Sequence, residues 1–207
     1  AFVAFNDDCS QGTGTGTIDT DYTFMQEVNY ILSGVVQVGN GNVPIASQVD
    51  YDAVVAQGVT LTVEAGSDVK AAADGVLLVT RGSQLVADGS AASPITFSSL
   101  DTGYDGTGEW GGVIIQGFAP QYGQGNTGVC YADGEAWCNV QGEGGDFVKE
   151  YGGAAADDNS GIIRYVRIAE GGLIAGPNNE INGLTLQGVG HGTLIDYVQV
   201  HGNQDDG

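Results

Sequence analysis

The chain has 207 residues, 42% of them hydrophobic, which is enough for one sizeable folded core. Its 26 Asp and Glu residues against five Lys and Arg give a formal net charge of −21. A protein this acidic repels nucleic acid and anionic membrane surfaces, and it attracts divalent cations. No apolar run approaches the roughly 18 residues that a membrane-spanning helix needs. We therefore expect neither a nucleic-acid partner nor a transmembrane segment.

The first 29 residues predict a strand-like tag followed by a flexible linker. The sequence "AFVAF" (residues 1–5) is apolar, whereas "NDDCSQGTGTGTIDTD" after it is polar and rich in Gly and Thr. The repeated "GTGTGT" is not followed by the GK[ST] motif of a phosphate-binding loop. We interpret residues 1–29 as a segment outside the main domain.

From residue 30 onward, the chain consists of short runs rich in β-branched residues and separated by Gly. These runs occupy residues 30–39, 59–66, 76–89, 93–100 and 110–117, and, after a loop insertion at about 118–159, residues 160–172, 179–190 and 192–203. No stretch longer than about ten residues shows a convincing helical period. The 36 glycines also favour turns over helix interiors. The pattern predicts an all-β fold.

The strand-like runs recur at similar intervals along the chain. Their starting positions are 16, 18 and 18 residues apart, at Leu61, Leu77, Ile95 and Val113. This repetition favours a solenoid over an antiparallel sandwich, in which hairpin turns would dominate. The segment "LTVEAGSDVKAAADGVLLVTRGSQLVADG" is typical of a parallel β-helix, with apolar residues stacked inward and Gly at the corners. We predict a parallel β-helix over residues 30–207, with the sandwich as the alternative.

Several blocks resemble a family of secreted or cell-surface β-helix proteins of Gram-negative bacteria, many of which are known only as lipoproteins. The blocks are "GEWGGVIIQGFAP", "DDNSGIIRYVRIAEGG" and "NEINGLTLQGVGHGTLIDYVQVHGNQDDG". The resemblance implies a right-handed parallel β-helix and an exported protein, but no particular activity. Members of that family usually continue past the Asp-Asp-Gly into further turns of the helix.

Three cysteines bear on the cellular compartment. Cys130 and Cys138 lie in "GVCYADGEAWCNV", and we expect a disulfide between them to close the loop insertion. No CxxC motif and no zinc-like Cys/His spacing is present. Together with the acidic surface, this favours an oxidising, extracellular setting. Cys9 is then left over, as a buried free thiol or as one half of an intermolecular disulfide.

Two acidic clusters are candidate calcium sites. Ca²⁺ takes six to eight hard oxygen ligands in flexible geometry, so closely spaced carboxylates and amides suit it. The candidate ligands are Asp157, Asp158 and Asn159 in one cluster and Asn203, Asp205 and Asp206 in the other. Neither cluster matches an EF-hand or a nonapeptide calcium repeat, and a solvated acidic loop is the alternative for each.

A polysaccharide lyase or hydrolase is a further alternative, because parallel β-helices include such enzymes. A lyase needs a base, often Arg or Lys, and a cation beside the substrate carboxylate. Strict strand alternation would put Arg164 with Val166 on one face and Arg167 on the other, so we expect no paired basic site there, only surface partners for carboxylates. Trp110 and Trp137 could stack on sugars, but structural packing is the simpler interpretation.

The ends of the predicted solenoid suggest self-assembly. An open β-helix end exposes unpaired backbone groups over an apolar core. The N-terminal strand, together with Cys9, could complete a neighbouring subunit by strand addition; its residues are Ala1, Phe2, Val3, Ala4 and Phe5. A longer chain, or capping by the chain's own N-terminus, would also cover an end. We expect a non-enzymatic extracellular filament or matrix subunit, forming a homo-oligomer or polymer, with an adhesin that binds surface polysaccharide as the alternative.

Overall fold

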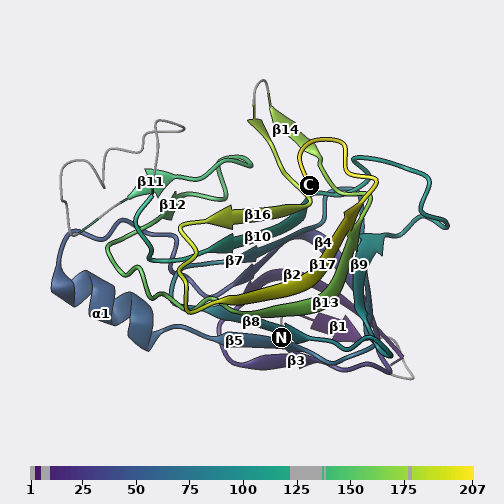
Figure 1. Ribbon diagram of the computed structural model, residues 1–207, viewed down its shortest axis with the longest axis horizontal. Helices are drawn as coiled ribbons and strands as arrows, with labels where there is room; N and C mark the ends of the chain where they lie inside the picture. The colour runs from purple at the N-terminus through teal and green to yellow at the C-terminus, as the bar shows by residue number, and fades with distance from the viewer. Residues whose placement is uncertain (1–2, 6–9, 122–136, 138, 177–178) are drawn as a thin grey trace.

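A computed structural model describes residues 3–5, 10–121, 137, 139–176 and 179–207 (Figure 1). Thirteen strands form one sheet, and all but one of its pairings are parallel. The chain passes repeatedly over three faces in the same order, and each complete turn, here called a rung, pairs in register with the rung before it. The predicted all-β parallel β-helix is confirmed.

Each face is a stack of strands from successive rungs. Face 1 contains β2 (Gln11–Ile18), β4 (Asn29–Val38), β6 (Asp68–Ala71), β9 (Ile95–Ser99), β13 (Gly161–Ala169) and β17 (Leu194–His201). Face 2 continues β2 and β4 and adds β7 (Val76–Val79), β10 (Gly112–Gln116) and β16 (Leu184–Gln187). Face 3 contains β3 (Tyr22–Phe24), β5 (Thr60–Val63), β8 (Gln84–Asp88) and parts of β13 and β17.

The remaining elements lie outside the three-faced coil. Helix α1 (Gln48–Ala56) connects β4 to β5, and Ser47 caps its first turn by accepting a hydrogen bond from the Asp50 backbone N–H. β1 (Val3–Phe5) pairs antiparallel with β2. Two short antiparallel pairs are formed by β11 (Val140–Gln141) with β12 (Glu150–Tyr151), and by β14 (Ile174–Gly176) with β15 (Asn179–Glu180).

Columns of apolar side chains from successive rungs form the core. Val38, Val79 and Ile115 occupy one register position on face 2, and each is 0% exposed. Burial of such side chains stabilises the fold by about 1.5–3 kcal/mol each relative to exposure. The coil therefore depends on every rung placing an apolar residue at the same point.

Two tyrosines turn their strands around a corner without a loop. Tyr165 in β13 has φ of 49° and Tyr197 in β17 has φ of 53°, both in the left-handed region. Their rings stack with a centroid distance of 4.4 Å and an interplanar angle of 6°. Because such a residue interrupts strand alternation, Val166 is buried while Arg164 and Arg167 both lie partly exposed. The expectation that Arg164 and Val166 share a face was wrong for this reason.

The linker predicted within residues 1–29 is also corrected. Residues 11–18 form β2, which pairs with β4 over most of its length, and residues 22–24 form β3 against β5. Thr is favoured in strands, and the hydrogen bonds that order this segment come from a strand 18 or more positions later. The segment is the first rung of the coil rather than a tether.

The predicted repeat length needs a second correction. Leu61, Leu77 and Ile95 lie on faces 3, 2 and 1, so the spacing of 16–18 residues measures steps between faces. Register partners in successive rungs are further apart: Leu61 pairs with Leu85 and Val69 with Phe97, which are 24 and 28 positions later. The strands were placed correctly, but their grouping into rungs was not.

We predict that a side chain at Gly161 disrupts the junction between β8 and β13. Gly161 has φ of 117°, and a Cβ there would lie 2.1 Å from the Leu85 carbonyl oxygen. Gly161→Ala should lower the free energy of unfolding by about 2–3 kcal/mol, measured by urea denaturation. Gly176→Ala is the matched control, because its nearest Cβ contact is 4.0 Å away. Equal unfolding midpoints for the two variants would contradict the predicted strain.

Candidate functional site

The first predicted calcium cluster is used to hold loops together. The Asp158 carboxylate accepts hydrogen bonds from the Ser160 hydroxyl at 2.9 Å and the Gly190 N–H at 3.3 Å, and a third from the Phe118 N–H. Burial raises the pKa of Asp158, and these hydrogen bonds oppose the rise. Asp157 and Asn159 are exposed, and the Asn159 side-chain oxygen accepts from the Gly161 N–H. The Asp158 and Asn159 side chains therefore each hold a neighbouring backbone segment.

The second predicted cluster lies beside the last turn of the chain. The Asn203 amide donates to the Asp206 carbonyl, while Asp205 and Asp206 are exposed. Burial, followed by the negative charges of Glu180, Asp205 and Asp206, raises the pKa of Glu143. Within the described residues, no group of three or more His, Cys, Asp or Glu side chains is arranged to hold a metal ion. Calcium binding remains a prediction.

The predicted assembly and disulfide residues are only partly described. Ala1, Phe2, Cys9, Cys130 and Cys138 lie outside the described residues, so the disulfide also remains a prediction. The strand that contains Val3, Ala4 and Phe5 is β1, and it pairs with Gly12–Gly14 of its own chain. Val3 is 5% exposed and joins the core. The N-terminal strand therefore covers part of the first rung within one molecule.

At the other end of the coil, no strand within the described residues pairs with the outer edges of β16 and β17. Among the described strands, β16 pairs only with β10 and β17 only with β13 (Figure 1). Leu186 follows Ile115, and Ile195 follows Ile163, in the same inward columns. Leu186 and Ile195 are 46% and 38% exposed, whereas Ile115 and Ile163 are at most 1% exposed. A hollow of about 670 Å³ lies against both exposed side chains and is also lined by Tyr151.

Two of the five Lys and Arg residues have clear structural roles. Arg81 is 0% exposed and donates to the backbone carbonyls of Gly41, Val43 and Gly152. Burial lowers the pKa of Arg81 to about 10, and the charge of Glu150 opposes that change. Arg164 makes a bidentate ion pair with Asp88, at 2.7 and 2.9 Å. Arg164 therefore has the carboxylate partner that we predicted for it.

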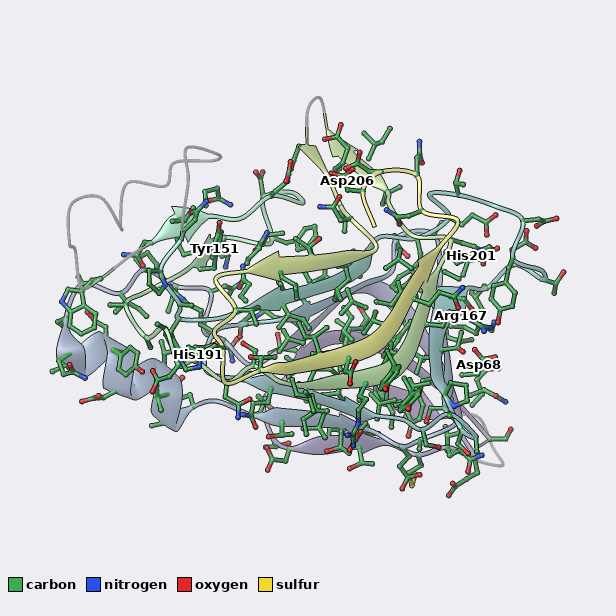
Figure 2. All side chains as sticks on the ribbon, viewed as in Figure 1. Asp68, Tyr151, Arg167, His191, His201 and Asp206 are labelled. Carbon is green, nitrogen blue, oxygen red and sulfur yellow. The ribbon has the colours of Figure 1, made fainter. Side chains whose placement is uncertain are left out.

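Lys70 and Arg167 both lie near the aromatic ring of Tyr104, on the outside of face 1. The Lys70 ammonium lies 5.9 Å and the Arg167 guanidinium 5.8 Å from the Tyr104 ring centroid. The His201 ring meets Tyr104 edge-on, and its Nε2 lies 3.2 Å from the Tyr104 carbonyl oxygen. Arg167 and His201 lie on the neighbouring strands β13 and β17 (Figure 2), where they line a cavity of about 210 Å³ with Tyr104 and Gln199.

The loop that carries Tyr104 is anchored by two glutamates. Ser99 lies at the end of β9, and its hydroxyl is 2.5 Å from the Glu109 carboxylate and 3.0 Å from that of Glu170. Glu170 is 1% exposed, has φ of 65° and accepts a further bond from the Gly106 N–H. Because a hydroxyl has one proton, Ser99 donates to one carboxylate at a time. This group fixes both ends of the loop and so positions Tyr104.

The cations around Tyr104 were not predicted as a site. Arg167 makes no ion pair among the described residues; its guanidinium donates to the Gln199 side chain and lies over the Tyr104 ring. Sequence reasoning missed the site because Lys70, Tyr104 and Arg167 are separated by more than 30 positions from one another. Trp110 is 0% exposed, and its indole N–H donates to the Ala169 carbonyl at 2.7 Å, so it packs in the core and cannot stack on a sugar.

Comparison with known proteins agrees with the fold. A family model described as a pectate-lyase like beta helix domain matches residues 42–207, which is most of the chain. No curated protein and no solved structure matches the chain. In the described residues, no helix is both long and apolar enough to cross a membrane. On the strength of the coil and of this match, the chain belongs to the pectate-lyase-like β-helix family.

Proposed function

We propose that this protein is a non-enzymatic structural protein of the cell surface or extracellular matrix, whose copies join head to tail through the uncovered last rung. The proposal depends mainly on the exposure of Leu186 and Ile195 at positions where every earlier rung buries its apolar residue. Inward-facing apolar side chains beside unpaired strands are a surface that another rung would cover.

The arrangement of the two ends favours a second copy as the occupant. Among the described strands, each end of the coil has strands that are paired along one edge only. On face 3 these are β17 at the last rung and β3 at the first, and on face 2 they are β16 at the last rung and residues 16–18 of β2 at the first. Placing the first rung of one molecule on the last rung of another continues the parallel pairing on both faces. On face 1, the free edge of β17 would meet β1. Such a head-to-tail contact repeats without closing, so it builds a filament.

An extracellular location fits the same proposal. Pectate-lyase-like β-helix domains are often extracellular, and a surface with a net charge of −21 suits a soluble component outside the cell. The three cysteines show no metal-binding spacing.

We predict that a charge at the inward positions of the last rung prevents assembly. Leu186→Lys or Ile195→Lys should weaken association at least about tenfold, because each removes apolar area from the joint and would bury a charge. Sedimentation velocity and negative-stain electron microscopy would compare each variant with the unmodified chain of 21.1 kDa.

The matched control is Leu194→Lys. Leu194 lies in β17 and is exposed like Leu186 and Ile195. Because it is adjacent to Ile195 in the strand, its side chain points outward. Assembly should survive this change.

Deleting residues 1–8 tests the N-terminal strand separately. If the truncated chain assembles normally, β1 does not take part in the contact between copies. Monomers of the unmodified chain at every concentration would contradict the proposal, and if a longer natural chain stays monomeric, its own later residues cover the rung.

Divalent cations should strengthen assembly. Copies with a net charge of −21 repel one another, and bound or screening cations reduce this repulsion. We predict that millimolar Ca²⁺ increases the assembled fraction and that a chelator reverses the increase. Mg²⁺ and NaCl at matched ionic strength separate screening from calcium binding, since only a calcium site would favour Ca²⁺ over both. No change with any salt would count against electrostatic control.

A second candidate function is recognition of an acidic polysaccharide at Tyr104. Its support is the cavity that Arg167 and His201 line with the Tyr104 ring on an acidic protein. Lys70 lies 5.9 Å from the same ring, with Asp68 as its ion-pair partner at 3.5 Å. A sugar ring stacks on an aromatic face, and a guanidinium binds a carboxylate in a bidentate manner. The family match is compatible with lyase activity on such a substrate.

We predict that Arg167→Ala lowers the affinity for uronic-acid oligosaccharides about tenfold, measured by calorimetry. Arg164→Ala is the matched control: it lies in the same strand but pairs with Asp88 on face 3, so it should affect stability only. Release of unsaturated products, followed by ultraviolet absorbance, would indicate a lyase. If Arg167→Ala and Arg164→Ala bind the oligosaccharides with equal affinity, the cavity at Tyr104 is not the polysaccharide site.

A further inference from the structure

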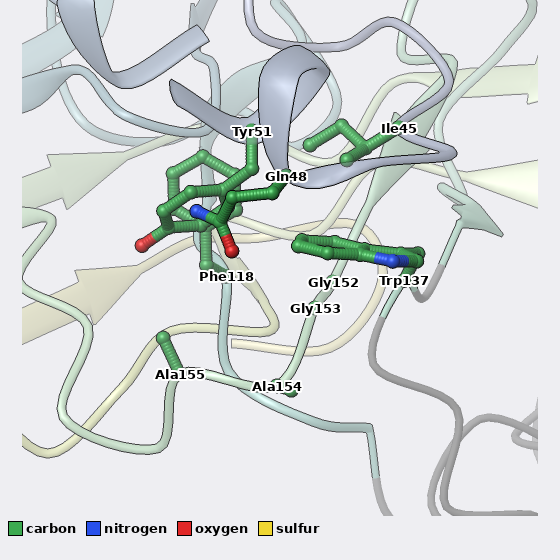
Figure 3. A pocket seen from close by; sticks show the side chains of 9 residues that line it. All are labelled: Ile45, Gln48, Tyr51, Phe118, Trp137, Gly152, Gly153, Ala154 and Ala155. Atoms are coloured by element: carbon green, nitrogen blue, oxygen red, sulfur yellow. The ribbon is translucent and has the colours of Figure 1, made fainter. Parts of the chain in front are cut away.

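A third cavity, lined by other residues than the hollow at Leu186 and the cavity at Tyr104, lies under helix α1. It has a volume of about 310 Å³, at the lower end of the range for small-molecule sites. Figure 3 shows the rings of Tyr51 and Phe118 on one side of this pocket and the Trp137 indole on the other. The Tyr51 ring centroid lies 4.7 Å from that of Phe118 and 6.1 Å from that of Trp137. Three aromatic rings therefore surround a small space.

The floor of the pocket is backbone that only glycine allows. A Cβ at Gly153 would lie 2.6 Å from the Phe118 carbonyl oxygen, and Gly152 has φ of 89°. The Gly152 carbonyl already accepts a hydrogen bond from Arg81 at 2.7 Å. Gln48 is the one lining side chain with an amide, and its Nε2 donates to Asp52 at 2.8 Å. Few polar groups thus remain for the several hydroxyls of a sugar.

Three carboxylates and one guanidinium lie near the pocket. The guanidinium is that of the buried Arg81, 5.8 Å from the Phe118 ring centroid, and the carboxylates lie near Tyr51. Burial raises the pKa of the Tyr51 hydroxyl, and nearby carboxylates raise it further; they belong to Asp158, Asp157 and Asp52. Asp52 also touches the lining directly through Gln48. A neutral apolar guest would gain nothing from the three carboxylates. A cation would be attracted by them and by the Tyr51 and Trp137 rings, and repelled by the single charge of Arg81.

We propose that the pocket between Tyr51, Phe118 and Trp137 binds a quaternary or methylated ammonium group. Such a group needs no hydrogen-bond acceptor, so it suits a lining with few free polar atoms. Aromatic rings attract it through their negative faces, and the carboxylates beyond the rings add long-range attraction. An unmethylated ammonium would lose hydrogen bonds to water that this lining does not replace.

Choline and its neutral analogue 3,3-dimethylbutan-1-ol have nearly the same shape and test the charge directly. Titration of each would be followed by calorimetry and by tryptophan fluorescence. Trp110 is 0% exposed, so a change on binding should come from Trp137 and disappear in Trp137→Phe. We expect choline to bind at least about tenfold more tightly than the alcohol.

Surface variants keep the test independent of folding. Asp157→Asn should weaken choline binding about twofold to threefold and leave the alcohol unchanged. Asp19→Asn is the control, since Asp19 is exposed in the turn between β2 and β3 and should alter neither titration. Equal affinity for choline and the alcohol would overturn the proposal and leave an apolar pocket. The absence of saturable binding by choline would also overturn it, whatever the oligomeric state of the sample.

Discussion

The structure depends on one constraint: an apolar side chain must stand at the same register position in every rung. Val38, Val79 and Ile115 meet this requirement on face 2, and the pairing of β4, β7 and β10 holds them in line. Each rung is covered by the next, so the core is a set of columns that runs the length of the coil. Leu186 is the last described member of its column, and it is 46% exposed within the described residues.

The same constraint leaves the connections between faces free to vary. Residues that join two strands do not belong to the columns, so a helix or a long loop can be inserted without moving the register. Helix α1 occupies one such connection, and the loop that carries Tyr104 occupies another. Both cavities with ligand-like surroundings are built on these insertions, as is common for sites placed on a rigid scaffold.

Charge is distributed unevenly over this scaffold. Arg81 is buried among backbone carbonyls and Arg164 is paired with Asp88, whereas Lys70 and Arg167 face Tyr104. Near the pocket under α1, three carboxylates lie around Tyr51 and one guanidinium, that of Arg81, lies against Phe118. The two cavities therefore differ in the balance of charge around their aromatic rings.

The sequence alone determined the fold class, because short β-branched runs and frequent glycines are local properties that need no partner to recognise. It also indicated where most strands lie. Only the tertiary structure decided which runs share a rung, because register partners such as Leu61 and Leu85 are far apart in the chain. The first rung was missed for the same reason: β2 is ordered by hydrogen bonds from β4. Tyr165 and Asp158 look ordinary in sequence, yet a left-handed backbone and three converging donors define their roles.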